Sequence, residues 1–281
     1  MTVKNKIVCG RVASLSPFTL VEADTVAGTA SSVAAVLPSS RSVQVGVTAT
    51  AFATIINIGP DPAVDCRLSL LTPVPATFAY QATNPATNQV VGTKNAPVDV
   101  SLGAAQSFVF ALTPTAPIAP TDVQLSFDCS NSDPAPINSG LNTLLFSASA
   151  TPVPDIVALA ATLNNDGVVH VAGPNGTGVF SVASVNVGAT DTVTVSVDTA
   201  DITLPLTLSL CETNPTTGQC ISAIGPGVTT TINANATPTF GIFVTGHGTV
   251  PFSPAVNRIF VRFSDAGGVS RGATSVAVQT E

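Results

Sequence analysis

The sequence is short of charge and lacks tryptophan. Only 9% of its 281 residues are Asp, Glu, Lys or Arg, against about a quarter in an ordinary soluble domain. Nine basic residues face sixteen acidic ones, and the net charge is -7. Nucleic acids and anionic lipids bind to basic surfaces, so both are excluded as partners. No apolar run approaches the roughly 18 residues of a membrane-spanning helix, so no membrane insertion is expected.

The residues that usually carry catalysis are also scarce. His170 and His247 are the two histidines, and neither lies in an H-E-x-x-H, paired C-x-x-C or G-x-S-x-G pattern. The stretches "LNNDG" (163–167) and "SDAGG" (264–268) offer oxygens for a weak calcium contact, but the same residues form tight turns, and the turn is the interpretation we favour. We therefore expect no enzyme, no catalytic residue, no cofactor and no metal.

What the sequence has in abundance is β-strand pattern. Stretches such as "SVQVGVTATAFATIINIG", "TVTVSV" and "RIFVRFS" alternate apolar and polar residues, with turn residues between such stretches. Apolar residues at helical spacing are nearly absent, and Pro or Gly recurs about every ten residues. The spacing of roughly 8 to 12 residues between turns is typical of β-sandwiches, so we predict an all-β chain.

An internal repeat divides the chain. "NIG" (57–59) matches "NVG" (186–188), and "TNP" (83–85) matches "TNP" at 213–215, at offsets of 129 and 130 residues. The offset grows to 136 at a later strand, as a few loop insertions would produce. The repeat predicts two tandem immunoglobulin-like β-sandwich domains of about seven strands each.

The repeat also sets the expected boundaries. The first sandwich is expected at residues 39–150 and the second at 156–281, joined by a linker at 151–155 that two prolines make stiff. Residues 1–38 lie outside the repeat and are interpreted as an N-terminal extension, an extra strand or an anchor.

Alternation predicts the core. In "RIFVRFS", Ile259, Val261 and Phe263 should face inward, and the intervening Arg258, Phe260 and Arg262 outward. The matching strand places Val123, Leu125 and Phe127 inward. Since Trp is absent, phenylalanines should fill the cores, and those expected to do so are Phe52, Phe108, Phe110, Phe127, Phe180, Phe240 and Phe263.

The repeat also gives a pairing for the five cysteines. Cys66 and Cys129 are both missing from the second copy, and Cys211 and Cys220 are both missing from the first. Joint presence and joint absence predict the disulfides Cys66–Cys129 and Cys211–Cys220, and leave Cys9 as the candidate for a bond between chains. The matching positions without sulfur are Val195, Asp265, Gln81 and Val90. Two disulfides indicate an oxidising location, although five reduced, buried thiols remain an alternative.

The start of the chain is a poor signal peptide, because Arg11 and several polar residues interrupt its apolar region. We expect either a piece of a longer exported protein or a phage structural protein that is released when the cell lyses.

The strings "LPSSRSVQVG", "YQATNPATNQ", "TPVPDIVALAAT" and "FVRFSDAGGVSRGATSVAV" carry a resemblance. Residues 36–280 resemble the C-terminal immunoglobulin-like tandem region of large, uncharacterised secreted or surface proteins of proteobacteria. The resemblance implies an extracellular, non-enzymatic module, and it supplies no site residues.

The sequence therefore favours a structural or interaction protein, outside the cell or on its surface. Few charges and hydroxyl-rich strands favour packing against copies of itself in a larger surface structure or filament. One alternative is a phage virion protein, either capsid decoration or appendage. A further alternative is an adhesin module that binds a glycan or a receptor through exposed aromatic residues, for which Tyr80 and Phe260 are the candidates.

Overall fold

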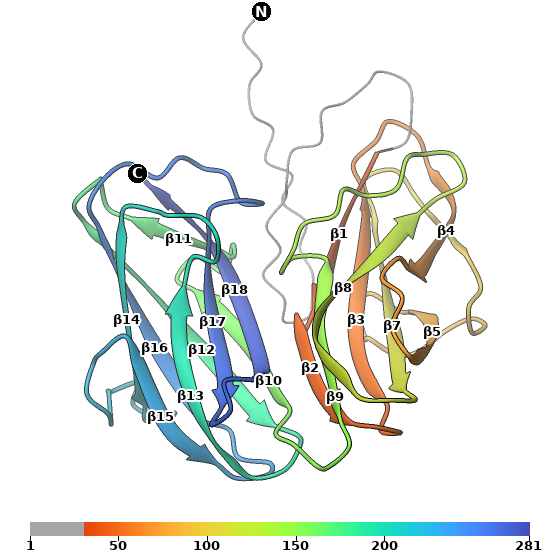
Figure 1. The fold of residues 1–281 in the computed structure, drawn as a ribbon. Coiled ribbons are helices and arrows are strands. Elements are labelled where there is room, and N and C mark those ends of the chain that lie inside the picture. The colour runs from red at the N-terminus through yellow and green to blue at the C-terminus, as the bar shows by residue number, and fades with distance from the viewer. Residues whose placement is uncertain (1–30) are drawn as a thin grey trace, which may run out of the picture.

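The structure is a computed structural model that describes residues 31–281, and Cys9 lies outside those residues (Figure 1). The regular structure of the described residues consists of strands, so the all-β prediction is confirmed. None of these residues belongs to a helix long and apolar enough to cross a membrane.

The first half folds into a sandwich of two sheets, with strand orders β1-β3-β7-β5 and β2-β9-β8-β4-β6. β1-β3-β7-β5 and β9-β8-β4 reproduce the two sheets of an immunoglobulin-like sandwich. Two further strands, β2 parallel to β9 and β6 antiparallel to β4, bring the total to nine where about seven were expected. The strands are β1 (Ser32–Leu37), β2 (Ser40–Gln44), β3 (Ala49–Asn57), β4 (Ala63–Leu70), β5 (Ala76–Thr83), β6 (Val98–Val100), β7 (Ala105–Pro114), β8 (Ile118–Asp128) and β9 (Thr143–Ser149).

The second half repeats this topology strand for strand. Its sheets have the orders β10-β12-β16-β14 and β11-β18-β17-β13-β15, which are the first two orders with every label raised by nine. The internal repeat thus corresponds to a duplicated sandwich. The strands are β10 (Ile156–Thr162), β11 (Val168–Val171), β12 (Thr177–Asn186), β13 (Asp191–Asp198), β14 (Leu206–Thr213), β15 (Gly227–Ile232), β16 (Thr239–Gly246), β17 (Arg258–Asp265) and β18 (Ser270–Thr280).

The first sandwich begins earlier than the repeat indicates. β1 lies before residue 39, yet it pairs with β3 from Ser32↔Asn57 to Leu37↔Phe52 and buries Val36 in the core. Two residues connect β1 to β2, whereas five residues, 163–167, connect β10 to β11. This difference shifts the alignment of the two copies, which is why the repeat did not include β1.

Each sandwich has its own core. Ile259, Val261 and Phe263, and in the other sandwich Val123, Leu125 and Phe127, are all fully buried, as alternation predicts. The other predicted phenylalanines are buried. Phe52 is an exception, and Phe146 is a core phenylalanine that was not predicted.

Phe52 was expected in the core but is 41% exposed, because Ala51 and Ala53 take the inward positions of β3. Phe146 on β9 is fully buried and was missed. Tyr80 is also buried, with its ring 5.9 Å from that of Phe108, so it is not an exposed binding platform.

Candidate functional site: the junction between the two sandwiches

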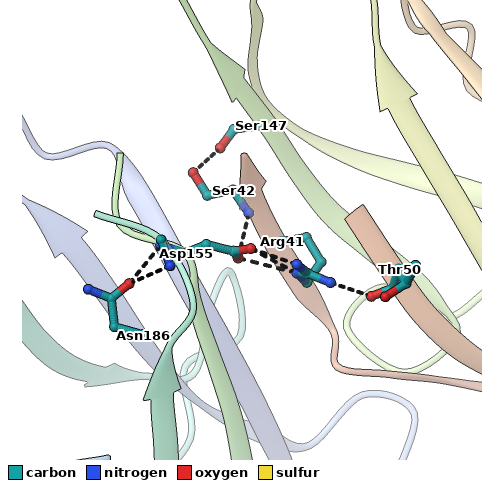
Figure 2. A network of polar contacts seen from close by, with 7 residues as sticks. Arg41, Ser42, Thr50, Ser147, Asp155 and Asn186 are labelled. Carbon is teal, nitrogen blue, oxygen red and sulfur yellow. Dashed lines mark hydrogen bonds and ion pairs between the residues drawn. The ribbon is translucent and has the colours of Figure 1, made fainter. Parts of the chain in front are cut away.

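Polar side chains gather where the two sandwiches meet. β2 of the first sandwich lies beside β18 and the start of β10 of the second, and the linker 151–155 crosses next to them (Figures 1 and 2). We call this contact the junction. Its residues are Ser39, Ser40, Arg41, Ser42, Gly140, Ser149, Asp155, Arg258, Arg271, Ala273 and Ser275.

An ion pair between Arg41 and Asp155 joins the sandwiches. The Asp155 carboxylate accepts hydrogen bonds from Arg41 Nη2 at 2.8 Å, Arg41 Nε at 3.0 Å and the Ser42 backbone N–H at 2.9 Å. Arg41 Nη1 also donates to the Thr50 carbonyl (Figure 2). The two charged side chains are 12% and 4% exposed. A bidentate and mostly buried ion pair of this kind fixes the relative position of the two groups that it joins.

Asn186 holds Asp155 from the other side. Its Oδ1 accepts the backbone N–H of Asp155 at 3.1 Å and that of Gly188 at 3.0 Å. A Cβ at Gly188 would lie 2.3 Å from the Val153 carbonyl oxygen, so glycine permits the linker to pass this closely. The linker is therefore fastened to the second sandwich before β10 begins.

The same asparagine stands in the first sandwich. Asn57 Oδ1 accepts the Gly59 N–H at 3.0 Å, and its Nδ2 donates to the carbonyls of Asp61 and Val100. Asn57 and Asn186 are both fully buried. This explains the repeated "NIG" and "NVG": the amide closes the end of β3 or β12, and in the second copy it also anchors the linker.

Serines of the first sandwich bind the backbone of β18. Ser39 Oγ donates to the Ala273 carbonyl at 2.9 Å, and the Ala273 N–H donates to Ser40 Oγ at 2.6 Å. Arg271 Nη1 donates to Ser42 Oγ at 3.1 Å and to Ser149 Oγ at 3.2 Å.

Asp265 holds the Arg271 guanidinium in place through an ion pair at 2.8 Å. Burial alone would raise the pKa of Asp265, but hydrogen bonds from the Val269 N–H and from Arg271 outweigh it and lower the pKa. The carboxylate is therefore charged over a wide pH range.

Arg258 was expected to point outward from its strand. It does point away from the core of its own sandwich, but it is only 5% exposed, because the first sandwich covers that face. Its Nε donates to Ser275 Oγ at 3.1 Å, and Ser275 Oγ donates to the Gly140 carbonyl. Burial lowers the pKa of Arg258 to about 10.

Phe260 lies on the same face. A Cβ at Gly140 would lie 2.6 Å from the Phe260 ring, and the Arg262 guanidinium carbon is 4.8 Å from the ring centroid. Phe260 is therefore packed between the sandwiches and an arginine instead of projecting as a free aromatic platform.

A shallow hollow of about 270 Å³ lies beside the Arg41–Asp155 pair, and Gln44, Val153 and Val187 are among the residues that line it. The charged groups at its wall are already bonded to each other. The polar groups of the junction therefore hold the two domains together.

The four disulfide-bonded cysteines are not among the junction residues. Cys66 on β4 is bonded to Cys129, just after β8, with an S–S distance of 2.08 Å. Cys211 on β14 is bonded to Cys220 at 1.93 Å. These are the two pairs that the repeat predicts.

The repeated "TNP" phrase forms the same hairpin loop in both copies. Asn84 Oδ1 accepts the Ala86 N–H, and Asn214 Oδ1 accepts the Thr216 N–H, each at 2.9 Å. The second copy adds the Cys211–Cys220 bond to a loop whose shape its own hydrogen bonds already hold.

The two stretches with calcium-type oxygens form turns. Asn165 and Gly167 have φ of 53° and 74°, and Gly268 has φ of 77°. Asp265 Oδ1 accepts the N–H groups of Gly267 and Val269. Within residues 31–281, no three His, Cys, Asp or Glu side chains gather as metal ligands would.

His170 on β11 lies between two carboxylates. Its Nε2 is 2.7 Å from Asp166 Oδ2, and its Nδ1 contacts Glu281 Oε1. Burial alone would lower the pKa of His170, but the hydrogen bonds to Asp166 and Glu281 outweigh it and raise the pKa. His247 donates to or accepts from Thr207 at 2.7 Å on the surface.

Sequence reasoning missed the junction. The signal that could have revealed it was the position of two charged residues in a chain with few charges. Arg41 interrupts a strand of small and hydroxylated residues, and Asp155 follows two prolines of the linker. Neither residue belongs to a periodic pattern, so neither stood out as a pair.

Fold and junction together define a class, that of tandem β-sandwich proteins braced by disulfides and by a polar contact between domains. The chain matches no family model and no curated protein. Among solved structures it is similar to the secreted serine protease VesC from Vibrio cholerae, at 12% identity, with 74% of this chain and 45% of that chain covered and a TM-score of 0.23. It is also similar to BcpA, the major pilin subunit of Bacillus cereus, at 12% identity, with coverages of 89% and 69% and a TM-score of 0.27. The chain spans less than half the length of the Vibrio protein. Similarity at this level carries no argument about function.

Proposed function

We propose that this chain is a non-enzymatic structural protein, an extracellular subunit that assembles with copies of itself into a larger surface structure. The observation that carries the proposal is the junction. Arg41, Asp155 and Arg271 turn two sandwiches into one body of fixed length, because the contacts hold the linker and both sheets at once. A fixed spacing between domains is what a subunit of an ordered assembly requires.

The disulfides support the location. Both bonds lie within a sandwich, one across 63 residues and one across 9. Such bonds persist in oxidising surroundings and are rare in the cytosol, so they favour a protein that works outside the cell. The resemblance of residues 36–280 to surface proteins points the same way.

The surface composition supports self-association. Only 9% of the residues are charged, so few charges oppose contact between copies. The same features would support self-association in a phage virion. That alternative differs only in where the protein is found. The adhesin alternative loses its candidate platforms, since Tyr80 is buried and Phe260 lies in the domain contact.

Cell fractionation combined with electron microscopy tests the proposal. In cells that make the full chain, the protein should be found in the extracellular or surface fraction, with Cys66, Cys129, Cys211 and Cys220 oxidised, and in particles larger than one chain. Sedimentation with phage particles would identify the virion form. Recovery of a reduced protein in the cytosol, or of a single chain of 28.1 kDa at every concentration, would overturn the proposal.

A further inference from the structure

A strand at the end of a sheet has backbone N–H and C=O groups without a partner, and another chain can pair with them. The four sheets formed by residues 31–281 end in eight such strands, namely β1, β5, β2, β6, β10, β14, β11 and β15. The two copies of the fold place these edges at equivalent positions, so each edge has an internal comparison.

Loops cover two of the edges. Val91 N–H donates to the Ala82 carbonyl and so occupies the edge of β5. On β14, Ile221 N–H donates to the Glu212 carbonyl, and Gly225 N–H donates to Leu210. These edges are therefore closed by the residues that follow them.

Contacts within the chain or short length protect four others. β2 and β10 lie at the junction, where the Ser42 N–H binds Asp155 and β10 packs against β18 and β2. On β1 the Val36 N–H donates to the Leu141 carbonyl. β11 has only four residues, and His170 on it contacts the carboxylates of Asp166 and Glu281.

The remaining edges, β6 and β15, are equivalent in the two copies, yet they differ sharply. β6 has three residues, and its partner β4 is irregular between Ala63 and Cys66. Asp65 has φ of 52° there, and its N–H donates to Asp99 on β6. A short strand, an irregularity and a charged residue on the edge strand are among the features that keep a sheet edge from pairing.

β15 has none of these devices. It is six residues long and pairs with β13 without a break, from Asp191↔Ile232 to Ser196↔Gly227. It contains no Pro and no charge, and it lies in a stretch of 45 residues, 213–257, without Asp, Glu, Lys or Arg. A long, uncharged and regular edge strand is a template for another strand.

We infer that β15 pairs in antiparallel fashion with β15 of a second copy of this chain, across a two-fold axis. The inference rests on the proposed self-assembly and names the strand that carries it. The occupant follows from the absence of charge: an uncharged strand meets its own copy without repulsion, and two-fold pairing of identical surfaces is the commonest form of oligomer.

The side-chain pattern fits a register centred on Thr230. Val228 and Ile232 face the core, whereas Thr229 and Thr231 are exposed on the outer face. An axis at Thr230 places Thr229 opposite the partner's Thr231 and Val228 opposite the partner's Ile232. Both faces of the joined sheet then continue with like residues, as the alternation of a strand requires.

The surroundings of β15 leave room for the partner. In the sheet order β11-β18-β17-β13-β15, two strands separate β15 from β18, the strand that contacts the first sandwich. Figure 1 shows β15 on the side of the second sandwich away from the first. The outer hydroxyls are also ordered, since Thr192 pairs with Thr231 and Thr194 with Thr229, each at 2.9 Å.

A charge exchange tests the pairing. Two variants of the full chain, Thr229→Lys with Thr231→Lys and Thr229→Glu with Thr231→Glu, are compared with the unchanged pair in a Cys9→Ser background that excludes covalent dimers. In each variant alone, like charges lie directly opposite each other and should raise the dissociation constant about tenfold or more. An equal mixture of the two places Lys opposite Glu and should restore the dimer.

Sedimentation velocity supplies the readout, with circular dichroism to check the fold. The expected result is a dimer of twice 28.1 kDa for the Cys9→Ser chain, single chains for each variant and a dimer for the mixture. The matched control, Thr192→Lys with Thr194→Lys, adds the same charge one strand further in and should leave the dimer intact.

Two results would overturn the inference in distinguishable ways. If the Cys9→Ser chain associates and the charge variants associate equally well, or if mixing restores nothing, the β15 edge is not the interface although self-assembly stands. If the Cys9→Ser chain remains a single chain at high concentration, both the pairing and the proposed self-assembly fail.

Discussion

Removing the Asp155 carboxylate should uncouple the two sandwiches. In Asp155→Ala, Arg41 loses the bonds from its Nε and Nη2, and the Ser42 N–H loses its acceptor. Breaking a buried ion pair by removing one partner costs roughly 3 to 5 kcal/mol. Because the Arg41 side chain is 12% exposed and can regain some water, we expect the lower end, a loss of about 3 kcal/mol in the free energy of unfolding.

The chain contains its own reporter for this experiment. Tyr80 is the only tyrosine, Trp is absent, and Tyr80 lies in the core of the first sandwich. Tyrosine fluorescence therefore follows the first sandwich, whereas circular dichroism follows both. In urea the two signals should change together in the unchanged chain and separate in Asp155→Ala, because the sandwiches then unfold independently.

A surface ion pair supplies the control. Asp198 and Arg262 also form a bidentate pair, but their side chains are 37% and 32% exposed. Asp198→Ala should cost less than about 1 kcal/mol and leave the two signals coincident. If Asp155→Ala cost no more than this control, or if its two signals stayed together, the junction would not be what couples the sandwiches.

Three further changes test other features. Replacing Cys66 and Cys129 together by Ala should lower the free energy of unfolding by about 4 kcal/mol in the chain-entropy model, measured in urea without reductant, and an unchanged midpoint would contradict a bracing role. Carboxylates raise the pKa of His170, so its pairing stabilises the fold below pH about 6.5 and fades as the pH rises through the raised folded value. His170→Gln should therefore lower the free energy of unfolding at pH 5.5 but not at pH 9, by less than about 1 kcal/mol for so exposed a pair, and an equal effect at both pH values would count against this. Asn57→Ala removes the donor to the Asp61 and Val100 carbonyls and should cost about 2 kcal/mol, visible as an earlier change in Tyr80 fluorescence, and a change confined to the other sandwich would refute it.

Alternation carried most of the fold prediction. A strand such as 258–265 with one buried face has a period of two, so Ile259, Val261 and Phe263 could be placed inward from the sequence alone. The repeat did the rest, because it showed that the fold occurs twice and which cysteines appear and disappear together. Alternation is read within one strand, and the repeat is read by comparing the chain with itself. Both can therefore be found in a single sequence.

What the sequence did not reveal depends on contacts between distant segments. Arg258 is outward by its own strand pattern and becomes buried only because the first sandwich covers it. Ser40 and Ala273 are 233 residues apart, and nothing in either neighbourhood announces their bond. Phe52 was misplaced because phenylalanines were expected to fill the cores, whereas Ala51 and Ala53 take the inward positions of β3.

The parallel pairs at the ends of each sandwich bear on how the chain responds to force. β2 runs parallel to β9 from Ser40↔Leu145 to Gln44↔Ser149, and β11 runs parallel to β18 from Val168↔Ala277 to Val171↔Thr280. In each case one strand lies near the entry of the chain and the other near its exit. Tension along the chain therefore pulls the two strands past each other, so that their hydrogen bonds are loaded together instead of opening one at a time from an end. Because forced unfolding is governed by the unfolding rate, we expect these short parallel pairs to resist unfolding under tension.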